Sequence, residues 1–257
     1  MSTVLDEICD GVREDVAARR ISDNELAEQI NSAPQPRDAY AALASTGISV
    51  IAEVKRASPS KGDLATIARP ADLAHQYAEG GAAVISVLTE QRRFKGSIAD
   101  FQSVRATVDV PLLRKDFIVT EYQVGESRAI GADLQLLIVA ALSQTQLKDF
   151  YQMTSELGMH SLIEIHDENE LERALDISPR IVGVNSRNLK DLSINADAFE
   201  RLLPLIPQDV VAVAESGISQ AEEVERVRQW GARAILVGES LVRAGEPAQA
   251  IRTLLGE

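Results

Sequence analysis

Short apolar runs rich in β-branched residues alternate with helical patterns from about residue 48 to the end of the chain. A strand of a parallel sheet reads as a short apolar run because both of its faces are covered, whereas an amphipathic helix repeats its apolar positions every three or four residues. The alternation therefore predicts consecutive parallel strand–helix units. The expected strands are residues 49–55, 83–88, 110–115, 134–138, 161–165, 181–185, 210–214 and 234–237.

The segments between these runs carry signals for helix starts and ends. A glycine adopts the left-handed conformation that follows many helices with the least strain, and a side-chain acceptor followed three residues later by Glu or Gln is typical of a helix start. Pro70 fits a first helical turn. The expected helix ends are at Gly80, Gly131, Gly158 and Gly231. The expected starts are Thr120 with Gln123, Ser143 with Gln146, Asp167 with Glu170, and Ser219 with Glu222.

The number of units favours a closed barrel over an open sheet. Eight strand–helix units in about 210 residues match the size of a (β/α)8 barrel, whereas an open doubly wound sheet usually has fewer strands. No glycine-rich nucleotide fingerprint follows the first predicted strand. We therefore predict an α/β chain of one domain over residues 1–257, a TIM barrel. Residues 1–47 are expected to form an N-terminal helical extension packed on it, because so short a segment could bury little by itself.

Charge and composition narrow the classes of partner and compartment. The formal net charge is −13 and no block rich in Lys or Arg occurs, so neither nucleic acid nor an anionic membrane is expected as a partner. Residues 1–20 mix charged and apolar positions, unlike a signal peptide, and no apolar run approaches the roughly 20 residues of a membrane span. The only cysteine, Cys9, cannot form an internal disulfide. These features lead us to expect a cytoplasmic protein.

Charged residues stand where the barrel core should be. Strand alternation puts Ile51, Glu53 and Lys55 on one face of the first predicted strand, so a carboxylate and an ammonium project inward near its carboxyl end. Burying ions in a core is costly, whereas the active sites of this fold are built at the C-terminal rim from the ends of several strands. A structural Glu–Lys pair that fills the mouth is the alternative interpretation for this segment alone.

Further predicted strands repeat this arrangement and end in an inward polar group. Each group alone could be a solvated rim residue, but the repetition at the same strand position favours a functional ring. The groups are Lys115 on the third strand, Glu164 on the fifth, Asn185 with Arg187 on the sixth, and Glu215 on the seventh.

The last two strand ends suggest a phosphate site. In this fold the loops after strands seven and eight commonly bind a phosphoryl group through backbone N–H donors, and Gly217 and Gly238 would permit that close approach. A glycine in such a turn more often only satisfies turn geometry. Glu239 fits an anion site only if its amide faces the phosphate and its carboxylate faces away.

Seven sequence blocks occur in the order expected of one known family, over residues 51 to 247. They are IAEVKRASPSKG, GGAAVISVLTEQRRFKGS, PLLRKDFIVTEYQVGESRAIGAD, LIEIHDENELERAL, VGVNSRNL, AESGIS and ILVGESLVRAGEP. In these blocks the chain closely resembles the indole-3-glycerol phosphate synthase family. The resemblance implies an enzyme of tryptophan biosynthesis, a carbon–carbon lyase without metal or cofactor. It would close the ring of 1-(2-carboxyphenylamino)-1-deoxyribulose 5-phosphate with loss of carbon dioxide and water.

The resemblance also implies roles for the inward residues. Lys115 matches the general acid that protonates the developing alkoxide when the aromatic carbon attacks the ketone. For the dehydration, Glu164 matches one assignment and the pair Glu53 and Lys55 matches another, and the sequence leaves this choice open. The other implied members of the catalytic group are Asn185, Glu215 and Ser216. The implied substrate contacts are Ser58, Phe94, Phe117, Arg187, Leu189, Gly217, Gly238 and Glu239, with Lys55 also placed near the phosphate.

Several features stay open at this level. Residues 58–62 contain Pro and Gly and could form either a mobile loop over the substrate or an ordered turn. Gln135 departs from the family pattern and could reach a polar neighbour or face a helix. The histidines, His75, His160 and His166, are interpreted as bystanders because they lie on different predicted elements and no metal-ligand spacing includes them.

Two other functions compete with the synthase. A phosphoribosylanthranilate isomerase has a similar barrel but is expected to carry a catalytic cysteine in its first strand, where this chain has Glu53 and Lys55. A barrel that binds a phosphorylated ligand without turnover is the second alternative. Under the synthase interpretation the partner is a small substrate with a phosphate and a carboxylate, and the protein is expected to be a monomer, with association with other enzymes of the pathway as an option.

Overall fold

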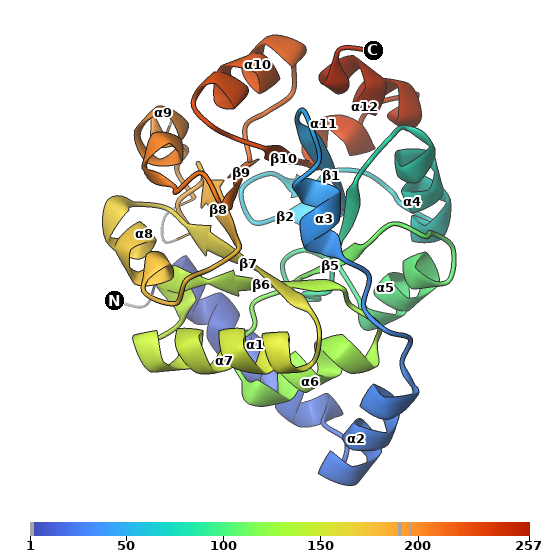
Figure 1. Cartoon of the computed structure of the whole chain (residues 1–257). Helices are drawn as coiled ribbons and strands as arrows, with labels where there is room; N and C mark the ends of the chain where they lie inside the picture. Colours follow the sequence, from blue (N-terminus) through green and yellow to red (C-terminus); the bar gives the residue numbers. More distant parts are fainter. Residues whose placement is uncertain (1–2, 190–191, 196) are drawn as a thin grey trace.

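Parallel strands close into a barrel in the part of the chain that the structure describes (Figure 1). The computed structural model describes residues 3–189, 192–195 and 197–257, so residues 1–2 of the predicted extension lie outside it. Around the barrel the order is β1-β10-β9-β8-β7-β6-β5-β4. The strands are β1 (Ser49–Val54), β4 (Val84–Leu88), β5 (Leu112–Lys115), β6 (Leu134–Ile138), β7 (His160–Ile165), β8 (Ile181–Asn185), β9 (Val211–Glu215) and β10 (Ala234–Val237). The predicted TIM barrel is confirmed, and the predicted runs differ from these strands only at their ends.

The register of the strands places the inward polar residues at one level of the barrel. Glu53 of β1 pairs with Ser86 of β4, and Asn185 of β8 pairs with Glu215 of β9. Below them the interior is apolar, with Ile51 among the buried side chains of one cluster. The side chains on the outer strand faces form a second cluster with the surrounding helices. The barrel thus has a dry lower core and a polar upper rim.

Helices surround the barrel and return the chain from one strand to the next. Two short strands, β2 (Ala57–Ser58) and β3 (Gly62–Asp63), form a separate hairpin after β1. The surrounding helices are α4 (Pro70–Glu79), α5 (Ile98–Arg105), α6 (Glu121–Ala129), η1 (Val139–Ala141), α7 (Gln144–Glu156), α8 (Glu168–Leu175), α9 (Ala198–Leu202), η2 (Leu203–Leu205), α10 (Ala221–Gln229), α11 (Glu239–Val242) and α12 (Pro247–Leu255).

Most of the predicted helix starts and helix ends are found in the structure. Thr120 with Gln123 and Ser143 with Gln146 form capping boxes, Asp167 accepts the N–H of Glu170, and Pro70 is the first residue of its helix. Gly131, Gly158 and Gly231 adopt positive φ after their helices.

Two of the signals were wrong by one residue. Helix α10 starts later than predicted, because Gln220 is its N-cap and the side chain of Glu223, rather than Glu222, accepts the N–H groups of Ser219 and Gln220. After α4 it is Gly81 that adopts positive φ, at +94°, while Gly80 stays at −76°. Gly80 serves packing instead, since a Cβ there would lie 2.8 Å from the backbone of α12.

The N-terminal segment covers both ends of the barrel. It forms α1 (Val4–Arg19), α2 (Asp23–Ser32) and α3 (Ala39–Leu43). In Figure 1, α3 lies in front of the barrel opening and α1 passes behind it. Leu43 of α3 is fully buried, Ile8 of α1 lines the cavity at the carboxyl ends of the strands, and α2 packs on α6. No helix among the described residues has the length and apolar character to cross a bilayer.

Polar side chains on the outer faces of the strands tie the helices to the barrel. Gln135, which the sequence left unexplained, faces α7 and donates to Oγ1 of Thr154. Arg114, fully buried, donates to Glu126 Oε2 at 2.7 Å, and Arg19 of α1 donates to the same carboxylate at 2.8 Å. The guanidinium of Arg114 also contacts Asp116, so α1, α6 and β5 are joined by one buried ionic group.

Candidate active site

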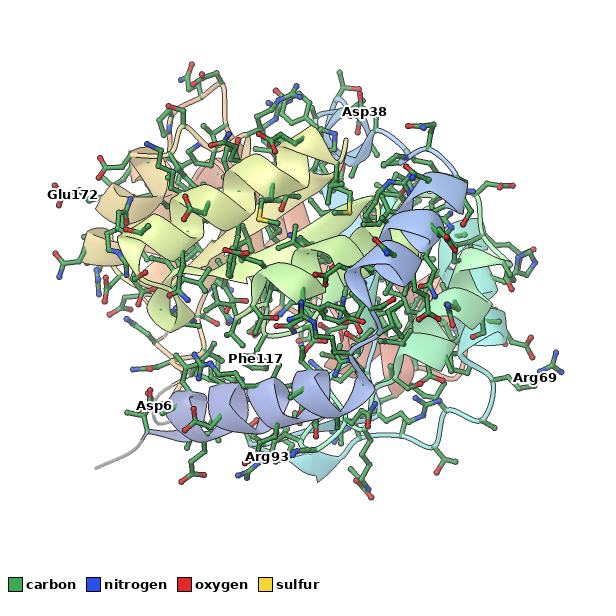
Figure 2. The ribbon with its side chains drawn as sticks, turned by 90° about the horizontal axis from the view of Figure 1, so that it is seen from below. Asp6, Asp38, Arg69, Arg93, Phe117 and Glu172 are labelled. Atoms are coloured by element: carbon green, nitrogen blue, oxygen red, sulfur yellow. The ribbon has the colours of Figure 1, made fainter. Side chains whose placement is uncertain are left out.

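A cavity of about 430 Å³ opens at the carboxyl ends of the barrel strands. Helix α1 borders it through Ile8, and Figure 2 shows Phe117 between this helix and the barrel. Every residue that the sequence analysis placed at the site lines this cavity. They are Glu53, Lys55, Ser58, Phe94, Lys115, Phe117, Glu164, Asn185, Arg187, Leu189, Glu215, Ser216, Gly217, Gly238 and Glu239.

Lys115 is the centre of the charged group. Its Nζ atom lies 3.4 Å from Glu164 Oε2 and 3.7 Å from Glu215 Oε2, and both carboxylates are buried. Burial alone would favour the neutral amine, but the charges of Glu164, Glu215 and Glu53 outweigh it and raise the pKa of Lys115. The side chain therefore carries a proton that it can donate inside the cavity.

The two carboxyls beside Lys115 differ in their protonation. Burial and the neighbouring charge of Glu164 raise the pKa of Glu215 well above its usual value. Burial also opposes ionisation of Glu164, but the charges of Lys115 and His166 and the side chain of Asn185 lower its pKa. The pKa values of the two carboxyls are thus shifted in opposite directions, so Glu215 holds a proton more tightly than Glu164, the kind of separation that assigns acid and base roles in enzymes.

Glu53 and Lys55 form a second ion pair at the rim. Lys55 Nζ lies 2.5 Å from Glu53 Oε1. Gly238, at the end of β10, makes room for this carboxylate, since a Cβ there would lie 2.6 Å from Glu53 Oε1. Gly183 makes room for Glu215 in the same way. These two glycines allow buried carboxylates to fit inside the barrel.

The turn after β9 has an unusual backbone. Ser216 has a φ of +69° and Gly217 a φ of +76°. Such a conformation is uncommon for a residue with a side chain and persists where the surroundings hold it. Here the hydroxyl of Ser186 donates to the carbonyl oxygens of Glu215 and Ser216. Ser216 and Gly217 of this strained turn line the cavity.

The hairpin of β2 and β3 forms part of the cavity rim. Lys61, in its turn, binds Glu239 Oε1 at 2.8 Å, and Arg243 binds the same atom at 3.1 Å. Although partial burial opposes ionisation, these cations lower the pKa of Glu239. Its carboxylate is thus compensated by two cations.

One wall of the cavity is apolar and another is built from the loop after β8. The rings of Phe94 and Phe117 are 6.0 Å apart and inclined at 41°. Asn185 Oδ1 accepts the backbone N–H of Arg187, and the guanidinium of Arg187 donates to the carbonyl of Leu192. The cavity thus offers an aromatic surface facing a rim of cations, carboxylates and an amide.

Three residues at the site were missed by sequence reasoning. His166 was interpreted as a bystander, but its Nε2 atom lies 3.5 Å from Glu164 Oε1 and its Nδ1 atom lies 2.9 Å from Glu170 Oε2. The signal was present, because residue 166 follows Glu164 by two positions and strand alternation puts both on one side. Lys61 and Arg243, which both bind Glu239, were also missed. Lys61 is far from Glu239 in the sequence, whereas Arg243 follows it by four residues and could have been found from the helical spacing.

The site has no arrangement typical of a metal centre within the described ranges. No group of three His, Cys, Asp or Glu side chains there could hold a metal ion.

Comparisons with known proteins agree over almost the whole chain. A family model described as indole-3-glycerol phosphate synthase matches residues 5–254. A relative of that name from Streptomyces griseus subsp. griseus is 55% identical over 255 residues, covering 98% of this chain and 95% of the relative. Another from Nocardioides sp. is 56% identical over 256 residues, covering 99% and 98%.

Solved structures with low sequence identity share the architecture. 3-Hexulose-6-phosphate synthase from Salmonella typhimurium has a TM-score of 0.66 at 12% identity, covering 81% of this chain and 97% of that one. Thiamine phosphate pyrophosphorylase from Pyrococcus furiosus has a TM-score of 0.59 at 15% identity, covering 80% and 93%. At these identities the likeness shows the fold alone.

Proposed function

The chain belongs to the indole-3-glycerol phosphate synthase family, and we propose that the buried ring of charges around Lys115 performs its reaction. It is a lyase of tryptophan biosynthesis that acts on a phosphorylated small molecule. The observation that carries the proposal is the contact of the Lys115 ammonium with two buried carboxyls inside one cavity, whose pKa values are shifted in opposite directions.

Lys115 acts as the general acid of ring closure. When the aromatic carbon attacks the ketone, the carbonyl oxygen becomes an alkoxide, and the ammonium of Lys115 gives it a proton. The bond between the ring carbon and the carboxylate then breaks, carbon dioxide leaves, and the electron pair of that bond restores the aromatic ring. The raised pKa of Lys115 supports this role because it keeps the donor charged before the attack.

Glu164 acts as the base of the dehydration. The hydroxyl must leave as water with a proton while the ring carbon loses one, and an ionised carboxylate beside Lys115 suits the second transfer. We assign the proton for the leaving hydroxyl to the ion pair of Glu53 and Lys55. Glu164 and the pair of Glu53 and Lys55, between which the sequence left the choice open, thus each act in one proton transfer of the dehydration. The variants Glu164→Gln and Glu53→Gln test the two transfers separately.

The remaining wall residues hold the substrate. The aromatic ring lies against Phe94, Phe117 and Leu189, Asn185 binds polar atoms of the reacting centre, and Arg187 faces the substrate carboxylate. Glu215 and Ser216 complete the group of catalytic residues. For the phosphate we propose the contacts Ser58, Gly217, Gly238 and the backbone of Glu239, with Lys55 close by.

The test is direct. Purified protein incubated with 1-(2-carboxyphenylamino)-1-deoxyribulose 5-phosphate is expected to produce indole-3-glycerol phosphate, followed by indole fluorescence. No product at high enzyme concentration would overturn the proposal and leave a binding barrel without turnover. Conversion of phosphoribosylanthranilate instead would favour the isomerase, an outcome that Glu53 and Lys55 on the first strand and Cys9 in α1 argue against.

We further propose that residues 1–257 work as a single barrel domain in which residues 1–47 are an integral cover, that the enzyme is a monomer, and that it acts in the cytoplasm. The burial of α1 and α3 on the two barrel ends supports the first point. Light scattering at working concentration tests the second, with complexes of pathway enzymes as the alternative.

A further inference from the structure

A second polar cavity lies beside the active site, on the other side of His166. Its volume is about 460 Å³, and it is lined by His166, Asp167, Glu170, Asn195 and Arg201 among others. Glu164 lines only the first cavity and His166 only the second, while Asn185 and Leu189 line both. The imidazole therefore stands between the active-site carboxylate and a separate polar space.

The contacts of His166 fix its ring. Glu170 Oε2 accepts the backbone N–H of His166 at 2.9 Å and contacts Nδ1 at the same distance. A carboxylate that binds Nδ1 selects the proton on that nitrogen and leaves Nε2 facing Glu164. Within the described part of the chain, Nε2 is buried and has no hydrogen-bond partner, while Glu164 Oε1 lies 3.5 Å away.

The groups around the imidazole are mostly anionic. Glu164 faces it from β7, and Asp167 and Glu170 from the start of α8. Asn185 of β8 is neutral, and Arg201 of α9 is paired with Glu168 at 2.8 Å. Burial alone would favour the neutral ring, but the hydrogen bond to Glu170 and these carboxylates raise the pKa of His166. A charged imidazole in turn stabilises ionised Glu164.

The proposed dehydration requires Glu164 to be ionised before it takes the proton from the ring carbon. Burial opposes this ionisation, and the charge of His166 is among the causes that lower the pKa of Glu164. A charged imidazole 3.5 Å from Oε1 therefore favours the form of Glu164 that can act as a base.

We propose that His166 is a positioning residue for Glu164, whose charged imidazole orients the carboxylate and holds it ionised before the reaction. This inference rests on the proposed base role of Glu164.

The first measurement is independent of activity. The chain has three histidines, so an imidazole NMR titration can resolve His166 from His75 and His160. We expect His166 to titrate above the usual range and to move downward by a measurable amount in Glu164→Gln, while His75 and His160 stay unchanged. An unchanged His166 titration in that variant would overturn the coupling, even if the enzyme proves to be an active synthase.

The second measurement is the pH profile of the single-turnover rate. Gln at position 166 can keep a hydrogen bond to Glu164 but cannot titrate, and Phe keeps neither. We expect His166→Gln to slow the reaction about tenfold, less than the roughly 10²–10⁴-fold of a direct proton-transfer group. KM should hardly change, and the decline of the wild-type rate above the pKa of His166 should disappear.

The matched control is His160→Gln, at the opposite end of the same strand, where the imidazole faces Asp38. This variant should keep the wild-type profile. A His166→Gln profile that is lowered equally at every pH would indicate a merely structural role and overturn the proposal. If wild-type protein makes no product at all, the proposed function fails instead, and the NMR result still decides the coupling.

Discussion

Lys115 Nζ lies 3.4 Å from Glu164 Oε2, although β5 and β7, which carry these residues, are not neighbours in the barrel. The hydrogen bonds of the sheet do not fix this distance, because they join only neighbouring strands. It is set by two inward side chains that meet at the barrel mouth, where Glu215 Oε2 also lies 3.7 Å from the ammonium. Their charges depend on one another, so changing one should alter the others.

Replacement of Lys115 by Met should abolish ring closure while substrate still binds. The change removes the proton donor, and we expect a loss of about 10²–10⁴-fold in kcat/KM. Lys115→Arg is the control, because it keeps a positive charge near Glu164 and Glu215 but gives up its proton far less readily. Turnover by product fluorescence and binding by calorimetry are the measurements. Near-wild-type turnover in Lys115→Met would remove Lys115 from its role.

Glu215 should make the folded state less stable as the pH rises. Because its folded pKa is raised, the neutral acid contributes stability that is fully present below the unfolded value near 4.5 and is lost as the pH passes through the folded pKa. Glu215→Gln copies the neutral acid and should remove this part of the pH dependence, giving a higher Tm than wild type at neutral pH. Calorimetric Tm values between pH 5 and 8, with the exposed Glu222→Gln as control, test this, and parallel curves for wild type and Glu215→Gln would contradict it.

Gly183→Ala should disturb the site through Glu215. A Cβ at position 183 would overlap Oε1 of that carboxylate and also lie 3.1 Å from Cδ1 of Leu162. Overpacking of this kind typically lowers the free energy of unfolding by about 1–3 kcal/mol, and moving Glu215 should also lower kcat. Gly245→Ala is matched, because a Cβ there meets nothing within 4 Å. Urea denaturation and steady-state kinetics provide the measurements; wild-type stability and kcat in Gly183→Ala would show that Glu215 has room to move.

Much of the barrel and its ring of charges was predictable because both follow from local periodicity. Parallel strands read as apolar runs, and alternation alone puts Glu53, Lys115, Glu164 and Glu215 on inner faces. The roles of these residues remain predictions. Contacts between distant segments carry no such local signal.

The failures have different causes. His166 was interpreted as a bystander because the three histidines lie on different predicted elements, although its partners Glu164 and Glu170 are close to it in the sequence. Gln135 stayed ambiguous because its partner Thr154 lies on another element. The start of α10 was misplaced because Glu222 and Glu223 both satisfy the pattern and only their orientation toward Ser219 decides between them. Long-range geometry had to come from the structure.

The buried ionic group of Arg114, Asp116 and Glu126 should contribute strongly to the free energy of unfolding. Arg114 is fully buried between Asp116 and Glu126, and Asp116 lines the active-site cavity. Arg114→Ala leaves two buried carboxylates with one fewer cation, so we expect the free energy of unfolding to fall by about 3–5 kcal/mol.

An exposed ion pair provides the control for this prediction, and the position of Asp116 at the cavity adds an expectation for KM. Arg13→Ala, at an exposed pair with Asp10, should change the free energy of unfolding by about 0–1 kcal/mol. Arg114→Met keeps apolar contacts but leaves the two buried carboxylates without this cation, so its free energy of unfolding should be well below that of wild type. A stability equal to wild type would contradict the argument. Because Asp116 also accepts the backbone N–H of Phe117, releasing it should loosen one aromatic wall of the cavity. KM should therefore rise in both Arg114 variants even at temperatures where they remain folded.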